Sequence, residues 1–324
     1  MGVLGAARIA PKALLVPAKD LPEVTVTAIA ARELARAERF AKRHGVARTH
    51  ASYHAVIDDP DIDAVYIPLP NGLHAEWTLR AIAAGKHVLC EKPFTSNASE
   101  AREVAAAADQ SGLVVMEAFH YRYHALAERM RAITHDGTIG RVSRISTSMC
   151  FPLPRFSDIR YRWDLAGGAM MDAGCYAIHC LRLLGNGEPT VLTAEAKTAK
   201  DPRVDRAMVV RYEFADGVSG QTTVSMWSRK LLGLSARAVG DRGEMRVTNF
   251  VLPQLFNRLK VTVDGKTSAE KVSGEPSYTA QLRAFVGAVL RGEPVLTPAS
   301  DAVITMSLID DVYRAAGLPV RGAA

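Results

Sequence analysis

The sequence predicts an α/β protein with a doubly wound parallel sheet in its first part and an open, mostly antiparallel sheet in its second. In residues 1–119, short β-branched runs alternate with alanine-rich stretches of helical apolar spacing, which is typical of parallel strands joined by crossover helices. After residue 119 the apolar runs are longer, alternate with polar residues and are separated by turn pairs such as Asp216-Gly217, as in antiparallel hairpins. We therefore expect two domains, 1–119 and 120–324.

The elements of the first part follow from short apolar runs and their spacing. Strands are expected at Val3-Leu4, Val24–Ala30, Ala64–Pro68, His87–Cys90 and Val114–Met116. Helices are expected between them, at Ile9–Leu15, Leu34–His44, His74–Ala84 and Ser99–Ser111. The first strand begins at the initiator methionine, so either this strand is trimmed or the true start lies upstream.

In the second part a bridging helix is expected near Tyr123–Thr134, followed by a series of strands. These strands are expected at Arg144–Met149, Val191–Ala196, Ala207–Phe214, Val218–Trp227, Leu234–Val239, Glu244–Thr248 and Leu259–Val263. Two helices close the chain, Tyr278–Arg291 and Ser300–Ala316. We expect Ser300 to cap the last helix and Gly317 to end it. This helix can pack back on the N-terminal domain.

Composition excludes several classes of protein. The 324 residues are 48% hydrophobic and 23% charged, which suits a large core and excludes a disordered or fibrous chain. There is neither an apolar run long enough to span a membrane nor a signal peptide, so a cytoplasmic location is expected. The net charge of +6 is spread along the chain and does not indicate a nucleic-acid partner. The four cysteines lack metal-site spacing, so we expect reduced thiols and no metal.

The segment from Gly5 to Ala10 lies where the first strand meets the first helix. Its backbone amides and the positive helix end can hold a pyrophosphate, with Gly5, Ala7, Arg8 and Ile9 as the contacting residues. The match to G-x-G-x-x-G/A is degenerate, because Ala7 replaces the second glycine and Ala10 stands at the third position. An ordinary strand-helix turn fits these residues equally well. The position at the start of a long alternating β/α half favours the dinucleotide site.

The end of the second strand reads Ala30-Ala31-Arg32, where an NAD enzyme normally has an acidic residue for the ribose hydroxyls. Ala31 leaves room for a 2′-phosphate, and Arg32 and Arg36 can bind it. The sequence therefore favours NADP, with NAD still possible. The alternative is that Arg32 is a solvated loop residue.

Two further segments carry side chains that packing explains poorly. Glu91-Lys92-Pro93 follows a strand at the carboxyl edge of the parallel sheet, where ligands bind. Asp172, Tyr176 and His179 have the spacing of one face of an apolar helix that begins after Gly167-Gly168. A polar stripe there indicates a ligand; the alternative is a buried network with only a structural purpose.

These segments together resemble the Gfo/Idh/MocA oxidoreductase family. The resemblance also covers Pro68–His74, Glu117–Tyr123 and Asp301–Gly317. It implies a Rossmann dinucleotide-binding domain at 1–119 and, at 120–324, an α/β domain that binds substrate and forms oligomers. It further implies hydride transfer between a nicotinamide and a sugar, polyol or related alcohol.

The resemblance also implies roles for single residues. Lys92 looks like the catalytic lysine, Asp172 the carboxylate that orients substrate and lysine, and Tyr176 the proton-transfer residue. A tyrosine is a poor base at neutral pH, and a neighbouring ammonium lowers its pKa. Inositol dehydrogenases have histidine in place of Tyr176, so this chain resembles the branch with glucose-fructose oxidoreductase, aldose 1-dehydrogenases and dimeric dihydrodiol dehydrogenase, which commonly uses NADP. The diol enzyme has tryptophan in place of His120, which favours a carbohydrate here.

The remaining expected contacts belong to two sets. Further cofactor contacts are expected from Pro68, Leu69, Asn71, His74, Glu91, Lys92 and Arg122. Substrate contacts are expected from His120, Phe151, Arg160, Asp172, Tyr176 and His179. The segment Phe151–Arg160 is too rich in proline for a strand and can form a wall of the site. An exposed basic loop containing Arg155, Arg160 and Arg162 is an equally good interpretation.

The leading hypothesis is an NADP-dependent sugar or polyol oxidoreductase that forms a homodimer or homotetramer. One alternative is a trans-dihydrodiol dehydrogenase activity. Another is a non-catalytic NADP-binding regulatory protein, although Lys92, Asp172 and Tyr176 together argue against it. A third is a tightly held cofactor recycled between two substrates. Alternation in Val218–Trp227 suggests an apolar outer sheet face for the oligomer.

Overall fold

The computed structural model describes residues 1–229 and 232–322. The chain forms two compact units. The first contains Met1–Tyr123 and Tyr278–Val303, and the second contains His124–Ser277 and the described residues from Ile304 onward. The expected domains 1–119 and 120–324 stay a prediction.

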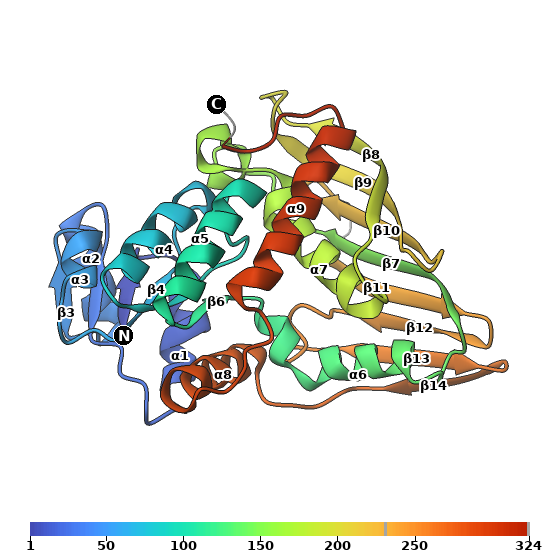
Figure 1. The fold of residues 1–324 in the computed structure, drawn as a ribbon, viewed down its shortest axis with the longest axis horizontal. Coiled ribbons are helices and arrows are strands. Elements are labelled where there is room, and N and C mark those ends of the chain that lie inside the picture. Colours follow the sequence, from blue (N-terminus) through green and yellow to red (C-terminus); the bar gives the residue numbers. More distant parts are fainter. Residues whose placement is uncertain (230–231, 323–324) are drawn as a thin grey trace. The chain divides into compact units, whose positions relative to one another are not determined.

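The first unit is built on a six-stranded sheet in the order β3-β2-β1-β4-β5-β6, in which every pair of neighbours is parallel. Its strands β3, β4 and β6 are labelled in Figure 1. The strands are β1 (Gly2–Leu4), β2 (Ala28–Ala30), β3 (Arg48–His50), β4 (Ala64–Ile67), β5 (His87–Cys90) and β6 (Val115–Glu117). The helices are η1 (Pro11–Leu15), α1 (Val16–Ala18), α2 (Leu34–His44), α3 (Tyr53–Ile57), η2 (Asn71–Leu73), α4 (His74–Ala83), α5 (Ala98–Ser111), η3 (His120–Tyr123) and α8 (Ser277–Arg291). This is the predicted doubly wound sheet.

Residues Tyr278–Val303, the second segment of the first unit, are hydrogen-bonded to the sheet at β6. The backbone N–H of Glu117 donates to the carbonyl of Thr297 at 3.0 Å, and the Thr297 hydroxyl donates to the Glu117 carbonyl at 2.7 Å. Met116 and Pro298 form an isolated β-bridge. These contacts explain why residues 278–303 join a unit whose other residues precede 124 in sequence.

Two predicted elements of the first unit need correction, and two further elements were not predicted. The strand expected over Val24–Ala30 is confined to β2, because Val24 donates to the Leu21 carbonyl in a turn. The helix expected over Ile9–Leu15 is a π-helix from Pro11. The elements β3 and α3 were not predicted: β3 is a half-buried edge strand without apolar alternation, and α3 has only five residues.

The second unit is built on an eight-stranded sheet in the order β14-β13-β12-β11-β7-β10-β9-β8. The strands are β7 (Val142–Cys150), β8 (Thr190–Thr198), β9 (Asp205–Glu213), β10 (Ser219–Ser225), β11 (Gly233–Gly240), β12 (Gly243–Thr248), β13 (Arg258–Val263) and β14 (Lys266–Glu270). Only β7 and β10 pair in parallel, so the sheet is mostly antiparallel, as predicted. Strand β14, in which every residue is exposed, was not predicted, because its residues show no apolar alternation.

Helices cover one face of this second sheet. Helix α7 (Cys175–Leu184) packs on β7 and β10, and α6 (Ala125–His135) packs against α7. Helix α9 (Ala299–Ala315) contacts α7, where Arg182 Nη1 donates to the Thr305 hydroxyl at 2.8 Å. The turns η4 (Ile159–Tyr161), η5 (Trp163–Leu165) and η6 (Met170–Gly174) precede α7. The Thr147 hydroxyl of β7 donates to the Ala177 carbonyl of α7 at 2.8 Å. A Cβ on Gly220 of β10 would lie 3.3 Å from Leu181. This glycine therefore lets α7 approach the sheet closely.

The last helix differs from the prediction at its start. It begins at Ala299, and the N–H groups of Asp301 and Ala302 donate to the Pro298 carbonyl, so Ser300 lies inside the first turn and is not the cap. Its end is as predicted: Gly317 has φ +66°, a left-handed conformation that glycine favours at a helix C-terminus.

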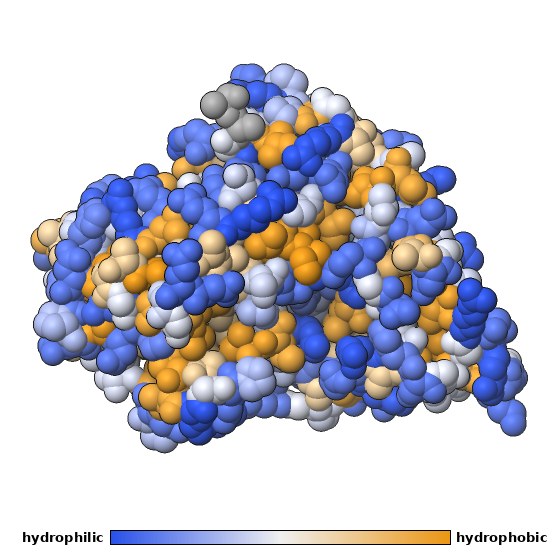
Figure 2. Space-filling view, in the orientation of Figure 1, coloured by the Kyte–Doolittle hydropathy of each residue, from blue (hydrophilic) through white to orange (hydrophobic). Residues whose placement is uncertain are grey.

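The surface and the helices can also be described by their hydrophobic character. Figure 2 shows hydrophilic residues over much of the visible face with hydrophobic patches between them. None of the helices in the described part of the chain is both long and apolar enough to cross a membrane.

Candidate active site

The strand-helix turn after β1 requires glycine at its first position. Gly5 has φ +114°, and a Cβ there would lie 2.9 Å from the Leu69 side chain. Its N–H donates to the Ala30 carbonyl at 2.8 Å, which fixes the turn to the end of β2. Ala10, at the third motif position, is fully buried. The turn therefore has the tight geometry and helix packing that a dinucleotide site needs, in spite of its degenerate motif.

A basic cavity of about 810 Å³ opens beside this turn. It is lined by Ala6, Ala7, Arg8, Pro11, Arg36, Arg39, Phe40, Arg43 and His44. The Arg36 guanidinium donates to the Ala6 carbonyl at 3.1 Å, which holds α2 against the turn. A cavity with four arginines suits the phosphates of a dinucleotide. The predicted contacts Ala7, Arg8 and Arg36 are thus brought together.

Two of these arginines were missed from the sequence. Arg39 and Arg43 lie three and seven positions after Arg36 on α2, which puts them on the same helical face. That spacing was the signal that could have found them. Arg32 does not line this cavity; it lies close to Tyr53, where its charge opposes the rise in the pKa of Tyr53 that burial causes. Ala31 is buried.

The turn after β5 holds Lys92 through its neighbours. The hydroxyl of Tyr66 donates to Glu91 Oε1 at 2.7 Å, and the Lys92 N–H donates to Glu91 Oε2 at 3.3 Å. Glu91 is buried, and its carboxylate binds both Tyr66 and the backbone of Lys92. It therefore has a structural role in addition to its predicted role as a cofactor contact. The carboxylate fixes the backbone from which the Lys92 side chain starts.

His74 connects this turn to the loop after β4. Its Nδ1 lies 2.7 Å from the Pro93 carbonyl oxygen and its Nε2 lies 2.8 Å from the Leu69 carbonyl oxygen. Burial lowers the pKa of His74, and the two carbonyls oppose that effect. Because both ring nitrogens face backbone carbonyls, His74 positions the loop that contains Pro68, Leu69 and Asn71.

A group near Lys92 joins distant parts of the chain. The ring of His120 in η3 stacks on that of Tyr278 in α8, with centroids 3.9 Å apart and planes 26° apart. Lys12 Nζ lies 5.7 Å from the Tyr278 ring centroid. Burial, followed by the charges of Lys92 and Lys12, lowers the pKa of His120 to about 3. His120 is therefore a neutral imidazole at physiological pH.

Lys12 and Tyr278 were not among the predicted site residues. Tyr278 is separated from His120 by more than 150 residues of sequence and carries no motif, so only the folded chain reveals the stack. Arg122, also predicted as a contact, lies half-buried in the same η3 turn as His120.

In the second unit, the expected helix with Asp172 starts differently from the prediction. Met170–Gly174 is a π-helical turn, in which the Cys175 N–H donates to the Met170 carbonyl, and the regular helix α7 begins at Cys175. The regular spacing that placed Asp172 on one face with Tyr176 and His179 therefore does not hold across this turn. Tyr176 and His179 are both buried within α7. Single π-turns of this kind occur often at functional sites.

The Asp172 carboxylate is paired with an arginine from the preceding loop. Arg160 Nε lies 2.9 Å from Asp172 Oδ2, and Arg160 Nη1 lies 3.1 Å from Asp158 Oδ1. The charge of Asp172 raises the pKa of Arg160. The structure thus brings two predicted substrate contacts together in one ion pair.

The other residues of this loop differ in their surroundings. Phe151 is half-buried, and its N–H donates to the Ser225 carbonyl at 2.9 Å. Arg155 and Arg162 are exposed, and Arg162 pairs with Asp164. For these two arginines the exposed-loop interpretation fits, whereas Arg160 is oriented by Asp172. Within residues 1–229 and 232–322, no cluster of His, Cys, Asp and Glu has the arrangement of a metal site.

Comparisons with known proteins agree with this architecture. Residues 1–119 match the model of an oxidoreductase family with an NAD-binding Rossmann fold, and residues 127–246 match the GFO/IDH/MocA C-terminal domain. D-xylose 1-dehydrogenase (NADP(+)) 2 of Haloferax volcanii is 36% identical, over 97% of this chain and 96% of that protein. Trans-1,2-dihydrobenzene-1,2-diol dehydrogenase of Mus musculus is 33% identical, over 71% of this chain and 68% of that protein.

A solved structure extends the likeness to three dimensions. The crystal structure of KijD10, a 3-ketoreductase from Actinomadura kijaniata in complex with NADP and TDP-benzene, has a TM-score of 0.90 and 31% sequence identity. The match covers 97% of this chain and 96% of KijD10. The chain therefore belongs to the Gfo/Idh/MocA family of oxidoreductases.

Proposed function

We propose that the protein is an NADP-dependent oxidoreductase that transfers a hydride between the nicotinamide and a sugar or related polyhydroxy alcohol. The observation that carries the proposal is the Glu91-Lys92 turn, in which a buried carboxylate fixes a lysine at the carboxyl end of β5. Ligands bind at this edge of doubly wound sheets. The xylose dehydrogenase relative and the KijD10 complex, both associated with NADP, support the choice of cofactor.

The residues present fit this cofactor. The Gly5 turn and the cavity with Arg8, Arg36, Arg39 and Arg43 would hold its phosphates, and Lys92 with Glu91 would lie toward its reactive end. When bound, the nicotinamide supplies the hydride acceptor or donor. The protein's own residues then have to bind the sugar and move the hydroxyl proton.

Proton transfer is assigned to Tyr176 and Lys92, and orientation to Asp172. In the oxidative direction the Tyr176 phenolate would accept the hydroxyl proton, while the Lys92 ammonium stabilises the phenolate. Asp172, held by Arg160, would direct the substrate hydroxyl. In support, solved variants of KijD10 replace one lysine and one tyrosine, and these two are separated by the same number of positions as Lys92 and Tyr176.

The choice of a sugar over an aromatic diol rests on His120. A neutral imidazole is more polar than the tryptophan that the diol enzyme has at this position, which favours a substrate with more hydroxyl groups. Activity on trans-dihydrodiols is the alternative, and the likeness to the mouse diol dehydrogenase supports it. A non-catalytic NADP-binding protein is the other alternative, and the retained Lys92 and Tyr176 argue against it.

The experiment is a panel of aldoses, polyols, sugar glycosides, trans-diols and a TDP-linked ketosugar, each assayed with NADP(H) and NAD(H) at 340 nm. We expect turnover with a carbohydrate and with NADP. Turnover with trans-diols alone would favour the alternative activity. Binding of NADPH without turnover of any substrate would favour the regulatory role.

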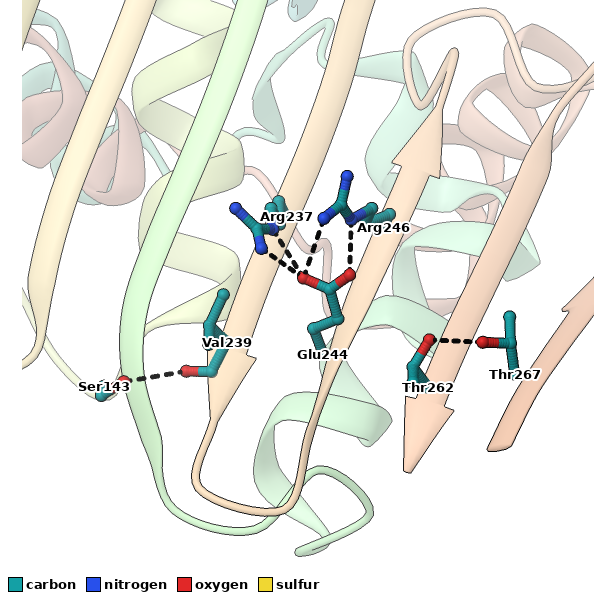
Figure 3. A network of polar contacts seen from close by, with 7 residues as sticks. All are labelled: Ser143, Arg237, Val239, Glu244, Arg246, Thr262 and Thr267. Atoms are coloured by element: carbon teal, nitrogen blue, oxygen red, sulfur yellow. Dashed lines mark hydrogen bonds and ion pairs between the residues drawn. The ribbon is translucent and has the colours of Figure 1, made fainter. Parts of the chain in front are cut away.

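We further propose a homodimer or homotetramer formed through the sheet face that α7 leaves open. The expected apolar character of this face was wrong: Val218 and Val224 are buried, and the other side of β10 presents Ser219, Gln221 and Thr223. Figure 3 shows the polar network beside it, in which Glu244 binds both Arg237 and Arg246. A hydroxyl-rich face with paired charges suits a polar interface. The cytoplasmic location stays a prediction.

A further inference from the structure

A fully buried ion pair lies at the start of the helix that carries Asp172. Arg321, near the C-terminus, places Nη2 2.9 Å from Oδ1 of Asp205 at the start of β9, and neither side chain is exposed. The Tyr313 hydroxyl of α9 donates to the same oxygen at 2.9 Å, and the Met170 N–H donates to Asp205 Oδ2 at 2.7 Å. Burial raises the pKa of Asp205, and these three donors oppose it.

The same arginine holds the glycine pair before the helix. Arg321 Nε donates to the Gly167 carbonyl at 2.8 Å. Gly168 has φ +143°, and a Cβ there would lie 2.8 Å from both Arg321 Nη2 and the Tyr313 hydroxyl oxygen. The cluster therefore explains why glycine is needed at position 168: a side chain would displace it.

The glycine pair also connects to both members of the Arg160–Asp172 ion pair. The Gly168 N–H donates to the Arg160 carbonyl at 2.9 Å, and the Asp172 N–H donates to the Gly168 carbonyl at 3.0 Å. The backbones of Arg160 and Asp172 are thus joined through one residue. On its other side, that residue packs against Asp205 and Arg321.

Stability alone does not explain such a cluster. Removing two charges from water costs about as much as their attraction returns, and apolar side chains of similar size often serve equally well. A buried ion pair with several hydrogen bonds does, however, select one geometry over its alternatives. The geometry selected here is that of the π-turn and the loop that bring Arg160 to Asp172.

We infer that Asp205 and Arg321 are positioning residues that set the orientation of Asp172 and Arg160 for the substrate. The inference rests on the proposed function, in which Asp172 and Tyr176 belong to the active site. The C-terminal segment then contributes to catalysis through Gly168 and the π-turn, without touching substrate.

The test compares Arg321→Met with Arg182→Met. Arg182 is the matched control, because it is also shielded, pairs with Glu188 at 2.6 Å and binds Thr305 of α9 at 2.8 Å, but near the far end of α7. We expect Arg321→Met to lower kcat/KM by roughly 10-fold to 100-fold, the range for misplaced catalytic groups. NADP affinity should change little in either variant. Arg182→Met should lose stability but keep most of its kcat/KM.

A spectroscopic readout reports on the cluster itself. The Arg321 guanidinium lies 4.7 Å from the Trp163 ring centroid. In a background with Trp77→Phe and Trp227→Phe, Arg321→Met should change the emission and acrylamide quenching of Trp163, and Arg182→Met should not. If Arg321→Met proves too unstable, Tyr313→Phe and Arg321→Lys provide milder perturbations, which should lower kcat/KM in the order of their effect on Trp163.

Each outcome is decisive when Tyr176→Phe is measured alongside. If the Trp163 signal changes in Arg321→Met while kcat/KM stays at the level of Arg182→Met, the positioning role is wrong and the proposed function stands. If no carbohydrate of the panel is turned over by the wild-type protein, the proposed function fails, and this inference with it. If Tyr176→Phe keeps full activity, Tyr176 is not the base, and the active-site position of Asp172 on which this inference rests is contradicted while the proposed function stands. Loss of kcat/KM in Arg321→Met that exceeds the control, with intact NADP binding and an inactive Tyr176→Phe, supports the role.

Discussion

Arg160 and Asp172 form an ion pair, with Arg160 Nε 2.9 Å from Asp172 Oδ2. The two residues come from different segments, a proline-rich loop and a π-turn, which the Gly167-Gly168 pair connects. This pairing means that the carboxylate expected to orient the substrate is itself oriented. Substitutions in the loop should therefore change how the substrate binds and reacts.

We predict that Arg160→Ala raises KM for the sugar and lowers kcat/KM by roughly 10-fold or more, because Asp172 loses an ion-pair partner that contributes to its direction. Steady-state kinetics with saturating NADP measures both constants. Arg162→Ala is the control, because Arg162 pairs with Asp164 and lies in the same loop. Equal kinetics for the two variants would contradict a role for Arg160.

Cofactor preference should depend on the basic cavity and on the end of β2. Replacing Ala31 with Asp and Arg32 with Ser should shift preference toward NAD, because a carboxylate accepts hydrogen bonds from ribose hydroxyls and repels a phosphate. Arg36→Ala should weaken NADP binding more than NAD binding. Lys42→Ala, on α2 but outside the cavity lining, is the control. Equal or better efficiency of the unmodified protein with NAD would argue against the NADP site.

The oligomer should be visible by light scattering coupled to size-exclusion chromatography. We predict a dimer or tetramer at micromolar concentration. Thr223→Asp, in the middle of the open sheet face, should weaken it, because a charge without a partner would be buried there. A substitution to Asp at the exposed Ser111, at the end of α5 in the other unit, is the control. A monomeric wild-type protein would rule the oligomer out.

Stability should fall as pH is lowered from about 6.5, in part because of His120. Its pKa is lowered to about 3 in the folded chain, by burial and by Lys92 and Lys12, whereas an unfolded histidine titrates near 6.5. Below pH 6.5 this histidine therefore binds a proton in the unfolded chain but stays neutral in the folded one. This difference lowers the free energy of unfolding by up to about 1.4 kcal/mol per pH unit.

Urea unfolding of wild type and His120→Gln between pH 7 and 4 measures this contribution. The variant should show a shallower loss of unfolding free energy with falling pH. His54→Gln, at an exposed histidine, is the matched control. Parallel pH curves for wild type and His120→Gln would contradict the assignment.

The sequence predicted those parts of the fold that local patterns encode. Helix α2 matches its predicted bounds, because the apolar spacing of Leu34–His44 ends at Gly45, which adopts φ +76°. Strand β5 also matches, because His87–Cys90 is a buried parallel strand next to a polar turn. In contrast, every residue of β14 is exposed, and the strand has no apolar pattern from which it could be predicted.

The candidate site was predicted only where chemistry and motif coincide in sequence. Lys92 and Tyr176 stand in such motifs. Lys12 and Tyr278 do not, because their importance arises from a stack and a cation contact between segments far apart in the chain. The π-turn at Asp172 was missed because helical periodicity assumes a constant number of residues per turn.

The central claim is that Lys92 and Tyr176 act as one proton-transfer unit. We predict that Lys92→Met and Tyr176→Phe each lower turnover by roughly 10²-fold or more, the range for loss of a positioned acid or base, with much smaller effects on NADP affinity. The double variant should be little worse than either single one, because residues that act as a unit are not additive.

The most direct measurement is the pH profile of turnover for Tyr176→Phe with saturating NADP and the best substrate of the panel. The account predicts a rate reduced by roughly 10²-fold, together with loss of the wild-type dependence on pH. A variant that keeps most of the activity with the wild-type pH profile would contradict it, and would assign the base to His179 or His120.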